Sequence, residues 1–198
     1  MKRFISLGVL ISLLTMTLPP ASEAYGRACG IERWSVKTIA DTEAPRIKGP
    51  LQTTVATLRA LPAPANPDTR PRSRFSPVEL TLFALTVQLD AVKIESDGDY
   101  HLVISDPNRP KQRMIAEIPA SYCVANARVA AAFHAARHAI RTLAHVTPRT
   151  ASFTWLDRRS RPVLLVLHGV GFFDRLHDQL GVAPNGIELH PVIGVSTP

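Results

Sequence analysis

The stretch from Glu79 to Asp106 decides the fold, and it reads ELTLFALTVQLDAVKIESDGDYHLVISD. Its first part places apolar residues on both faces of an extended chain as far as Ile94. The segment Asp97-Gly98-Asp99 follows, and its glycine supplies the positive φ that a hairpin turn needs. The stretch therefore predicts two antiparallel strands, the first buried on both faces, as in two packed sheets or a small barrel.

Further strands and one helix are predicted around this hairpin. Apolar patterns typical of strands cover 31–40, 112–118, 152–156, 163–170 and 187–195, and 51–61 is either a short strand or a helical turn. The helix is predicted to begin after Asn126, a good N-cap residue, and to end near His145 because Pro148 follows. Its apolar residues repeat at spacings of four and three, and they are Val129, Phe133, Ala136, Ile140 and Leu143.

The order of these elements predicts a single, mainly β domain over residues 25–198 with one main α-helix. Five strands with a helix between the third and the fourth is the order of the OB-fold, a small Greek-key β-barrel that often binds oligonucleotides or oligosaccharides. A small α+β sheet domain with a flanking helix is the alternative. Neither fold by itself decides the function.

The first 24 residues have the pattern of a signal peptide. Lys2 and Arg3 precede an apolar run, and Ser22-Glu23-Ala24 offers the small residues that a signal peptidase prefers. We therefore expect a mature chain from Tyr25, located in the periplasm or secreted. No later apolar run is long enough for a transmembrane segment.

The chain has two cysteines, Cys29 and Cys123, and both belong to the expected mature chain. In an oxidising compartment such a pair is most simply a disulfide. A catalytic or metal-binding thiol is the alternative, although the chain has no C-x-x-C motif.

Basic residues outnumber acidic ones and give a formal net charge of +7 at pH 7. This surplus favours acidic partners such as nucleic acid, anionic envelope polymers or an acidic protein. A Pro/Arg-rich loop at 62–77 carries Arg70, Arg72 and Arg74, and it is either a proline-stiffened connection or an arm that binds phosphate.

The predicted helix carries a second set of cations. Arg128, Arg137 and Arg141 lie outside its apolar stripe, and no acidic residue occurs between Glu117 and Asp157. This surface is either a solvated helix face or a basic binding face. His134 and His138, one turn apart on the helix, offer a less favoured site for a metal ion.

The segment from Glu79 to the helix resembles the staphylococcal-nuclease type of OB-fold. In that family an Asp-Gly-Asp hairpin supplies a calcium ligand and the third strand supplies an arginine that grips phosphate, positions matched here by Asp97, Asp99 and Arg113. The family's next metal ligand and catalytic glutamate have one possible substitute, Glu117. The resemblance implies phosphodiester hydrolysis with calcium or magnesium. The whole chain also resembles a set of uncharacterised exported bacterial proteins with ERW-VKT, DGDYHLV, AEIP and GVAPNGIELHPV-like segments, which implies no activity.

A second candidate site lies near the C-terminus. Glu188 and His190 are two residues apart on a predicted strand and share a face, and His177 and Asn185 precede them in a loop. These residue types serve hydrolytic metal sites and general acid–base pairs. The alternative is that Asn185 forms a turn while Glu188 and His190 make structural hydrogen bonds.

Two functions follow from these patterns. The first is an exported OB-like module that binds nucleic acid or another polyanion without turnover, through the basic helix and the arginine loop. The second is a metal-dependent phosphodiesterase or nuclease that uses the hairpin acids. The chain has no nucleophile elbow, phosphate loop, dinucleotide fingerprint or H-E-x-x-H motif, which removes the common enzyme classes that depend on them.

Overall fold

The structure, a computed structural model, describes residues 28–67 and 70–198. The expected signal peptide lies outside these residues. Within the described part of the chain, no helix has both the length and the apolar character needed to cross a bilayer.

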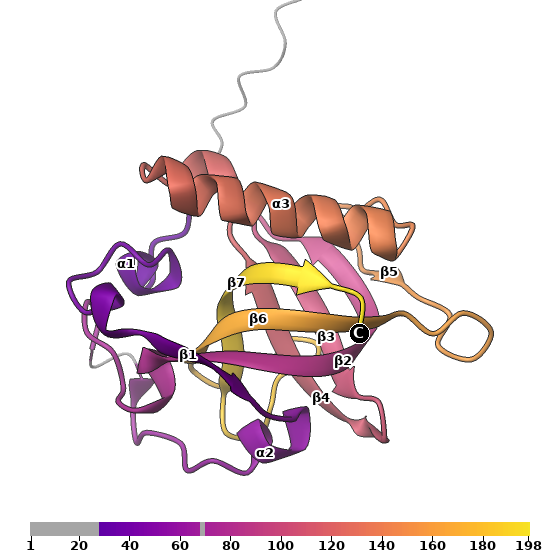
Figure 1. The fold of residues 1–198 in the computed structure, drawn as a ribbon, viewed down its shortest axis with the longest axis horizontal. Helices are drawn as coiled ribbons and strands as arrows, with labels where there is room; N and C mark the ends of the chain where they lie inside the picture. Colours follow the sequence, from indigo (N-terminus) through magenta and orange to yellow (C-terminus); the bar gives the residue numbers. More distant parts are fainter. Residues whose placement is uncertain (1–27, 68–69) are drawn as a thin grey trace, which may run out of the picture.

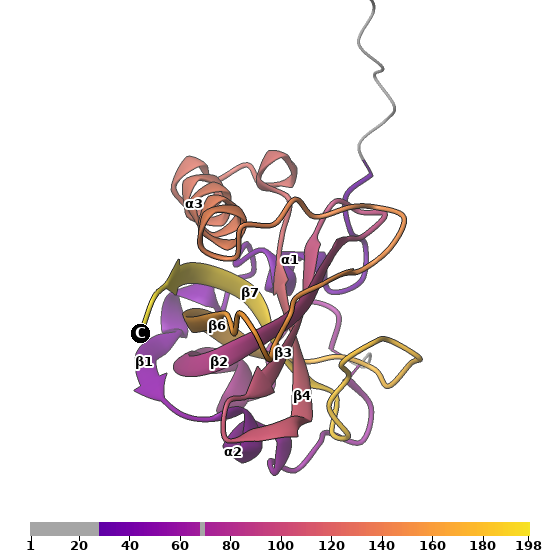
Figure 2. The same cartoon turned by 90° about the vertical axis from the view of Figure 1, so that its right-hand side faces the viewer.

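Seven strands form one mixed sheet that closes into a ring (Figures 1 and 2). The hydrogen-bonded order is β1-β2-β3-β4-β7-β6, and β2 also pairs with β6 and with β5. Among the strands of the described residues, the β1–β2 and β4–β7 pairs are parallel and the others are antiparallel. The strands are β1 Lys48–Gln52, β2 Thr81–Ile94, β3 Tyr100–Asp106, β4 Arg109–Ile118, β5 Thr154–Trp155, β6 Leu164–Phe173 and β7 Ile187–Ser196.

The long strand β2 organises the sheet, as its two apolar faces predict. Its first half pairs with β6 between Leu82 and Gln88, and its second half pairs with β3 as far as Ile94. The register of the β2–β3 pair shifts between Leu89 and Ala91, so Asp90 lies at a β-bulge. Most of β2 is buried, because the strand forms part of two pairs at once while its side chains fill the ring.

One main helix, α3 Ala127–Leu143, lies along one end of the ring beside β7 (Figure 1). Asn126 caps it, since its side chain accepts hydrogen bonds from the backbone N–H groups of Arg128 and Val129. Phe133, Ala136 and Ile140 are buried against the sheet. The predicted helix, its cap and its apolar face are therefore confirmed.

The segment 31–40 was predicted as a strand, and this is wrong, because it contains the short helix α1 Trp34–Lys37. Arg33 adopts a left-handed conformation with φ 49°, which interrupts an extended chain. Its guanidinium donates to both carboxylate oxygens of buried Glu79, at 2.8 and 2.6 Å. This long-range pair fixes the local conformation and overrides the alternating pattern of the sequence.

Other boundaries also differ from the sequence patterns. The third strand begins at Arg109 rather than at residue 112, and the strand expected over 152–156 is the two-residue β5. Within 51–61 the helical alternative holds, as α2 Val55–Arg59. Short 3₁₀ helices lie between these elements, among them η1 Ala44–Arg46, η3 Val78–Leu80 and η4 Ser121–Cys123.

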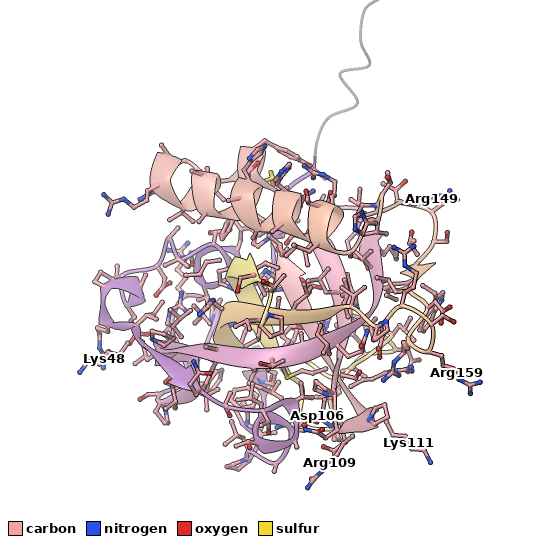
Figure 3. All side chains as sticks on the ribbon, turned by 45° about the vertical axis from the view of Figure 1, so that its right-hand side comes forward. Lys48, Asp106, Arg109, Lys111, Arg149 and Arg159 are labelled. Carbon is pink, nitrogen blue, oxygen red and sulfur yellow. A yellow bond between two sulfur atoms is a disulfide. The ribbon has the colours of Figure 1, made fainter. Side chains whose placement is uncertain are left out.

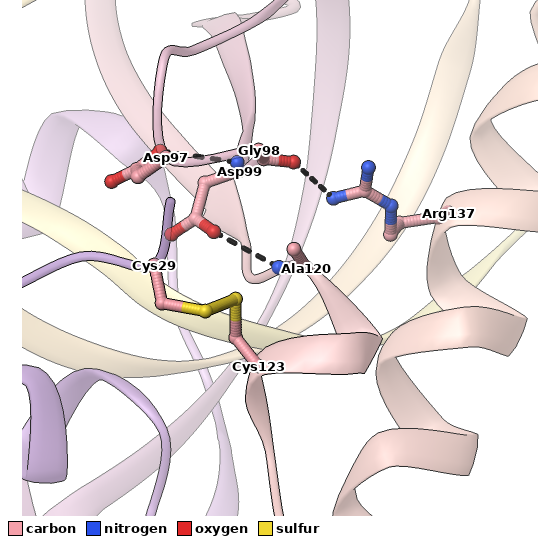
Figure 4. The surroundings of a disulfide bond; sticks show 7 residues. All are labelled: Cys29, Asp97, Gly98, Asp99, Ala120, Cys123 and Arg137. Carbon is pink, nitrogen blue, oxygen red and sulfur yellow. Dashed lines mark hydrogen bonds between the residues drawn. A yellow bond between two sulfur atoms is a disulfide. The ribbon is translucent and has the colours of Figure 1, made fainter. Parts of the chain in front are cut away.

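The predicted disulfide between Cys29 and Cys123 is present, with its Cα atoms 5.8 Å apart (Figure 4). It joins the N-terminal segment to η4, next to the turn between β2 and β3. A disulfide is consistent with an extracytoplasmic location. A free catalytic thiol is excluded for this pair, since neither cysteine of the described chain is free.

Candidate functional site

Five ionisable side chains from three neighbouring strands and one turn meet on the face of the sheet opposite the hydrophobic core, because they alternate along the strands with core residues such as Leu102, Ala116 and Leu189. We call them the acid–histidine cluster. They are Asp99, His101, Glu117, Glu188 and His190, each less than a tenth exposed. Strand pairing brings them together: His101 of β3 stands opposite Glu117 of β4, and Ile115 of β4 pairs with Glu188 of β7. Because side chains alternate along a strand, Glu117, Glu188 and His190 point to the same face.

His190 lies at the centre of the acid–histidine cluster. Its Nδ1 atom is 3.0 Å from Glu117 Oε2 and 3.2 Å from Glu188 Oε1, and its Nε2 atom is 3.7 Å from Asp99 Oδ2. His101 binds the carbonyl oxygen of Leu180 through Nε2 at 2.9 Å. Its Nδ1 atom lies 3.3 Å from Glu117 Oε1, within ion-pair distance but outside hydrogen-bonding geometry.

Burial and close contacts perturb the protonation of this cluster. Burial opposes charge on Glu117, but contacts with His101 and His190 hold the pKa of this carboxyl well below its usual range. Burial would lower the pKa of His190, and the contacts with Glu117 and Glu188 outweigh it and raise the pKa to about 9. Burial raises the pKa of Asp99 to about 6. The cluster thus combines a firmly ionised carboxylate, an imidazolium and an acid that titrates near neutrality.

The turn that carries Asp99 is held from several sides (Figure 4). Asp97 Oδ1 accepts a hydrogen bond from the N–H of Asp99, and Asp99 Oδ1 accepts one from the N–H of Ala120. Arg137 of α3 donates to the carbonyl of Gly98 at 2.8 Å. A side chain at Gly98, where φ is 88°, would collide with the hydroxyl of Tyr122. This support fixes one oxygen of Asp99 and leaves the other turned toward His190.

A pocket of about 480 Å³ opens next to the cluster, and Glu117 forms part of its wall. We call it the acidic pocket, because five carboxylates face two basic side chains and one histidine there. Its charged and titratable lining residues are Glu32, Glu95, Asp97, Glu117, Asp174, Lys37, Arg175 and His177. Two ion pairs join lining residues to each other, Arg175–Glu32 at 3.1 Å and Lys37–Asp174 at 3.9 Å, and Glu95 pairs with Lys93 behind the wall at 3.0 Å. The surplus of carboxylates favours cations over anions.

A second pocket, of about 800 Å³, lies at the opposite end of the β3–β4 hairpin, and we call it the basic groove. Its charged lining residues are Lys111, Arg113, Arg158 and Arg159, without a carboxylate among them. Figure 3 shows Lys111 beside the β3–β4 turn and Arg159 on the same side of the molecule.

The buried carboxylate of Asp90 forms ion pairs with two arginines of the basic groove and fixes their orientation. Its carboxylate receives Arg113 Nε at 3.0 Å and Arg158 Nε at 2.8 Å, and it also accepts from the hydroxyl of Ser105. The guanidinium of Arg113 lies 5.7 Å from the ring centre of Trp155, which is 55% exposed. The basic groove therefore combines four cationic side chains with the exposed indole of Trp155, and the buried carboxylate of Asp90 neutralises part of this charge.

The structure brings together part of each of the two candidate sites that the sequence predicted, the hairpin set and the C-terminal set. Asp99 and Glu117 of the hairpin set meet Glu188 and His190 of the C-terminal set. Asp97 and His177 line the acidic pocket beside them. Two members of the predicted sets do not join: the Asn185 amide donates to the carbonyls of Leu58 and Leu61, and Arg113 binds Asp90 at the other end of the hairpin.

Three of the six arginines predicted to bind a polyanion are held within the protein. Arg137 lies 3.7 Å from the ring centre of Tyr100, and Arg141 donates to the hydroxyl of the same tyrosine. Arg74 is buried in an ion pair with Asp41 at 2.6 Å and cannot face a ligand in solution.

Three of the predicted arginines stay exposed, and they are Arg70, Arg72 and Arg128. The predicted basic helix face is thus reduced to one of its three arginines.

Several residues of both pockets were missed by sequence reasoning. Lys37 was predicted to lie on a strand that does not form, Trp155 was predicted only as part of the strand over 152–156, and Arg158 and Arg159 were assigned no role. His101 lies two residues after Asp99 in the sequence, and that spacing was the one local signal of its place in the cluster. The remaining convergence depends on pairings between strands far apart in the sequence.

No family model, curated protein or solved structure matches this chain.

Proposed function

We propose that the ring is an OB-type barrel whose basic groove binds a linear polyanion, single-stranded nucleic acid above all. The support for the fold is the closed order β2-β3-β4-β7-β6 with α3 between β4 and β6. This is the strand order and helix position of a five-stranded Greek-key barrel. In this reading β1 and β5 are additions at the edges of the barrel.

The observation that carries the proposal is the pair of arginines held by Asp90 next to exposed Trp155. Asp90 contacts both guanidiniums through Nε, while the side chains of Arg113 and Arg158 remain 36% and 26% exposed. Arg158 also donates to the hydroxyl of Ser105 at 3.2 Å and to the carbonyl of Pro110 at 3.4 Å. A guanidinium fixed in this way offers its unengaged N–H groups to phosphate with little further loss of rotamer entropy. Exposed Lys111 and Arg159 add charge, and an exposed indole offers a face on which a base can stack.

The proposed ligand would bind with a characteristic salt dependence. Each phosphate contact on a single strand changes the slope of log K against log salt by about −0.7. Four cations therefore predict a slope no steeper than about −3. Stacking on Trp155 adds a contribution that salt does not screen, worth about 1–3 kcal/mol per base.

A fluorescent single-stranded oligonucleotide, followed by anisotropy over a series of salt concentrations, tests this proposal. Arg159→Gln is expected to weaken binding and to reduce the slope by about 0.7. Trp155→Ala is expected to weaken binding with little change in slope. Arg128→Gln is the matched control, because Arg128 is an exposed arginine on α3 outside the groove. Equal weakening by the Arg128 and Arg159 variants, or no saturable binding at all, would overturn the proposal.

A second candidate function is metal-dependent phosphodiester cleavage, favoured by the proximity of Asp99 and Glu117. Two observations weigh against it as the first choice. Arg113, the residue expected to grip phosphate, is held by Asp90 far along the hairpin, and the pocket next to Asp99 is acidic and repels phosphate. Measuring the fragment length of the same oligonucleotide after incubation distinguishes the two functions. Cleavage that a chelator stops and that is lost in Asp99→Ala would support the phosphodiesterase function over binding without turnover.

A further inference from the structure

The acid–histidine cluster contains buried polar atoms that lack a hydrogen-bond partner. Among the described residues, four buried side-chain nitrogen or oxygen atoms have none, and three of them belong to the cluster: Asp99 Oδ2, His101 Nδ1 and His190 Nε2. An unpartnered buried polar atom costs about 1–3 kcal/mol of desolvation. His101 Nδ1 lies 3.3 Å from a carboxylate oxygen of Glu117, whereas Asp99 Oδ2 and His190 Nε2 face each other across 3.7 Å and point to a group that satisfies both.

Each of these side chains is fixed through its other polar atom. Asp99 Oδ1 accepts from the N–H of Ala120, and His101 Nε2 binds the carbonyl of Leu180. His190 Nδ1 contacts Glu117 Oε2 at 3.0 Å and Glu188 Oε1 at 3.2 Å. Anchoring one ring nitrogen by a carboxylate or a carbonyl is the usual way to orient a metal-ligating histidine, because it fixes the tautomer and the direction of the other nitrogen.

Direct pairing between these atoms does not explain the arrangement. His190 Nε2 and Asp99 Oδ2 are 3.7 Å apart, which is too long for a hydrogen bond. One ligand atom from each of Asp99, Glu117 and His190 lies within 4.8 Å of the others. A small inward movement brings three such atoms to about 2.0–2.2 Å from a common ion.

We propose that Asp99, Glu117 and His190 bind one divalent transition-metal ion of the zinc type. Calcium and magnesium prefer oxygen ligands alone, whereas imidazole combined with carboxylates suits zinc and its neighbours in the first transition series. Glu188 acts on the site through His190, as the partner of its other ring nitrogen. The site is independent of polyanion binding, since the basic groove lies at the other end of the hairpin.

The acidic pocket supplies the route for the ion. Glu117 belongs both to the ligand set and to the pocket wall. The surplus of carboxylates along this pocket attracts cations from solution. Three protein ligands leave one position of a tetrahedral ion for water or another small ligand, on the side of Glu117.

Isothermal titration of the chelator-treated mature protein with ZnCl₂, MnCl₂, CaCl₂ and MgCl₂ tests this inference. We expect one zinc ion per chain, bound more tightly than calcium or magnesium. His190→Gln and Asp99→Asn should abolish this binding, and Glu188→Gln should weaken it by about 10–100-fold. His134→Gln is the matched control, because His134 is exposed on α3. It should bind zinc like the wild type.

Zinc-edge X-ray absorption of the wild-type protein provides a readout that no unfolded variant can obscure. The expected spectrum shows nitrogen and oxygen ligands with imidazole scattering and no sulfur, since both cysteines form the disulfide. The inference is overturned if the wild type binds no zinc. It is equally overturned if folded His190→Gln and Asp99→Asn keep wild-type affinity, or if His134→Gln loses binding.

Discussion

Replacing Arg74 by methionine tests whether this arginine is a structural anchor or a ligand-binding side chain. Its side chain is fully buried, and three short contacts link its guanidinium to Asp41, the closest at 2.6 Å. It also donates to the backbone carbonyls of Glu79 and Val36, at 3.0 and 2.9 Å. The Arg74→Met variant keeps most of the side-chain volume and removes every one of these donors.

The expected loss of stability arises because the carboxylate of Asp41 stays buried without its partner. Removing one partner of a buried ion pair costs about 3–5 kcal/mol, because the other charge stays buried without compensation. The side chain of Asp41 is 1% exposed and cannot turn to solvent without unfolding its surroundings. We therefore expect Arg74→Met to lower the free energy of unfolding by about 3–5 kcal/mol.

Urea denaturation followed by circular dichroism measures this loss. Arg72→Met is the matched control in the same loop, because Arg72 is exposed and a surface substitution usually changes stability by less than about 0.5 kcal/mol. The double variant Arg74→Met/Asp41→Leu removes both charges and should recover part of the loss. If Arg74→Met unfolds at the wild-type urea concentration, Arg74 does not anchor the loop.

Three more predictions follow from the structure. Replacing Cys29 and Cys123 together by serine should lower the free energy of unfolding by about 5 kcal/mol on the chain-entropy model, measured by urea denaturation, because the bridge spans a sequence separation of 94 residues. Metal-free wild-type protein should lose about 3 kcal/mol of stability as the pH rises from 6.5 to about 9, since the carboxylates of the acid–histidine cluster outweigh burial and Lys37 in raising the pKa of His190. That contribution is fully present below pH 6.5, and His190→Gln should flatten this part of the pH profile. Phe133→Ala should cost about 3–5 kcal/mol in thermal unfolding, because Phe133 is fully buried between α3 and the sheet.

The sequence was informative wherever the physical signal is local. Alternating apolar residues around a tight Asp-Gly turn predicted the β2–β3 hairpin, since period-two burial and positive φ are properties of a few consecutive residues. The N-cap at Asn126 and the four-and-three spacing predicted α3 for the same reason. The two-cysteine count was enough for the disulfide once an oxidising compartment was expected.

The sequence failed where a distant partner decides the conformation or the accessibility of a residue. The segment around Trp34 reads as a strand, yet the bidentate contact between Arg33 and Glu79, 46 residues apart, holds it in another conformation. Arg74 belongs to a loop for which phosphate binding was one prediction, and it is instead buried in an ion pair with Asp41. These ion pairs join residues far apart in the sequence, so no local sequence pattern predicts which pairs form.

The sequence by itself thus determined the hairpin, the main helix and the set of residue types available for chemistry. Only the tertiary structure decided which of them meet. The closure of β2 on β6 and the parallel pairing of β4 with β7 bring Glu117 next to His190, although 73 positions separate them in the chain. The physical reason is that strand register is set by the burial of whole faces, a property of the assembled ring that no single segment contains.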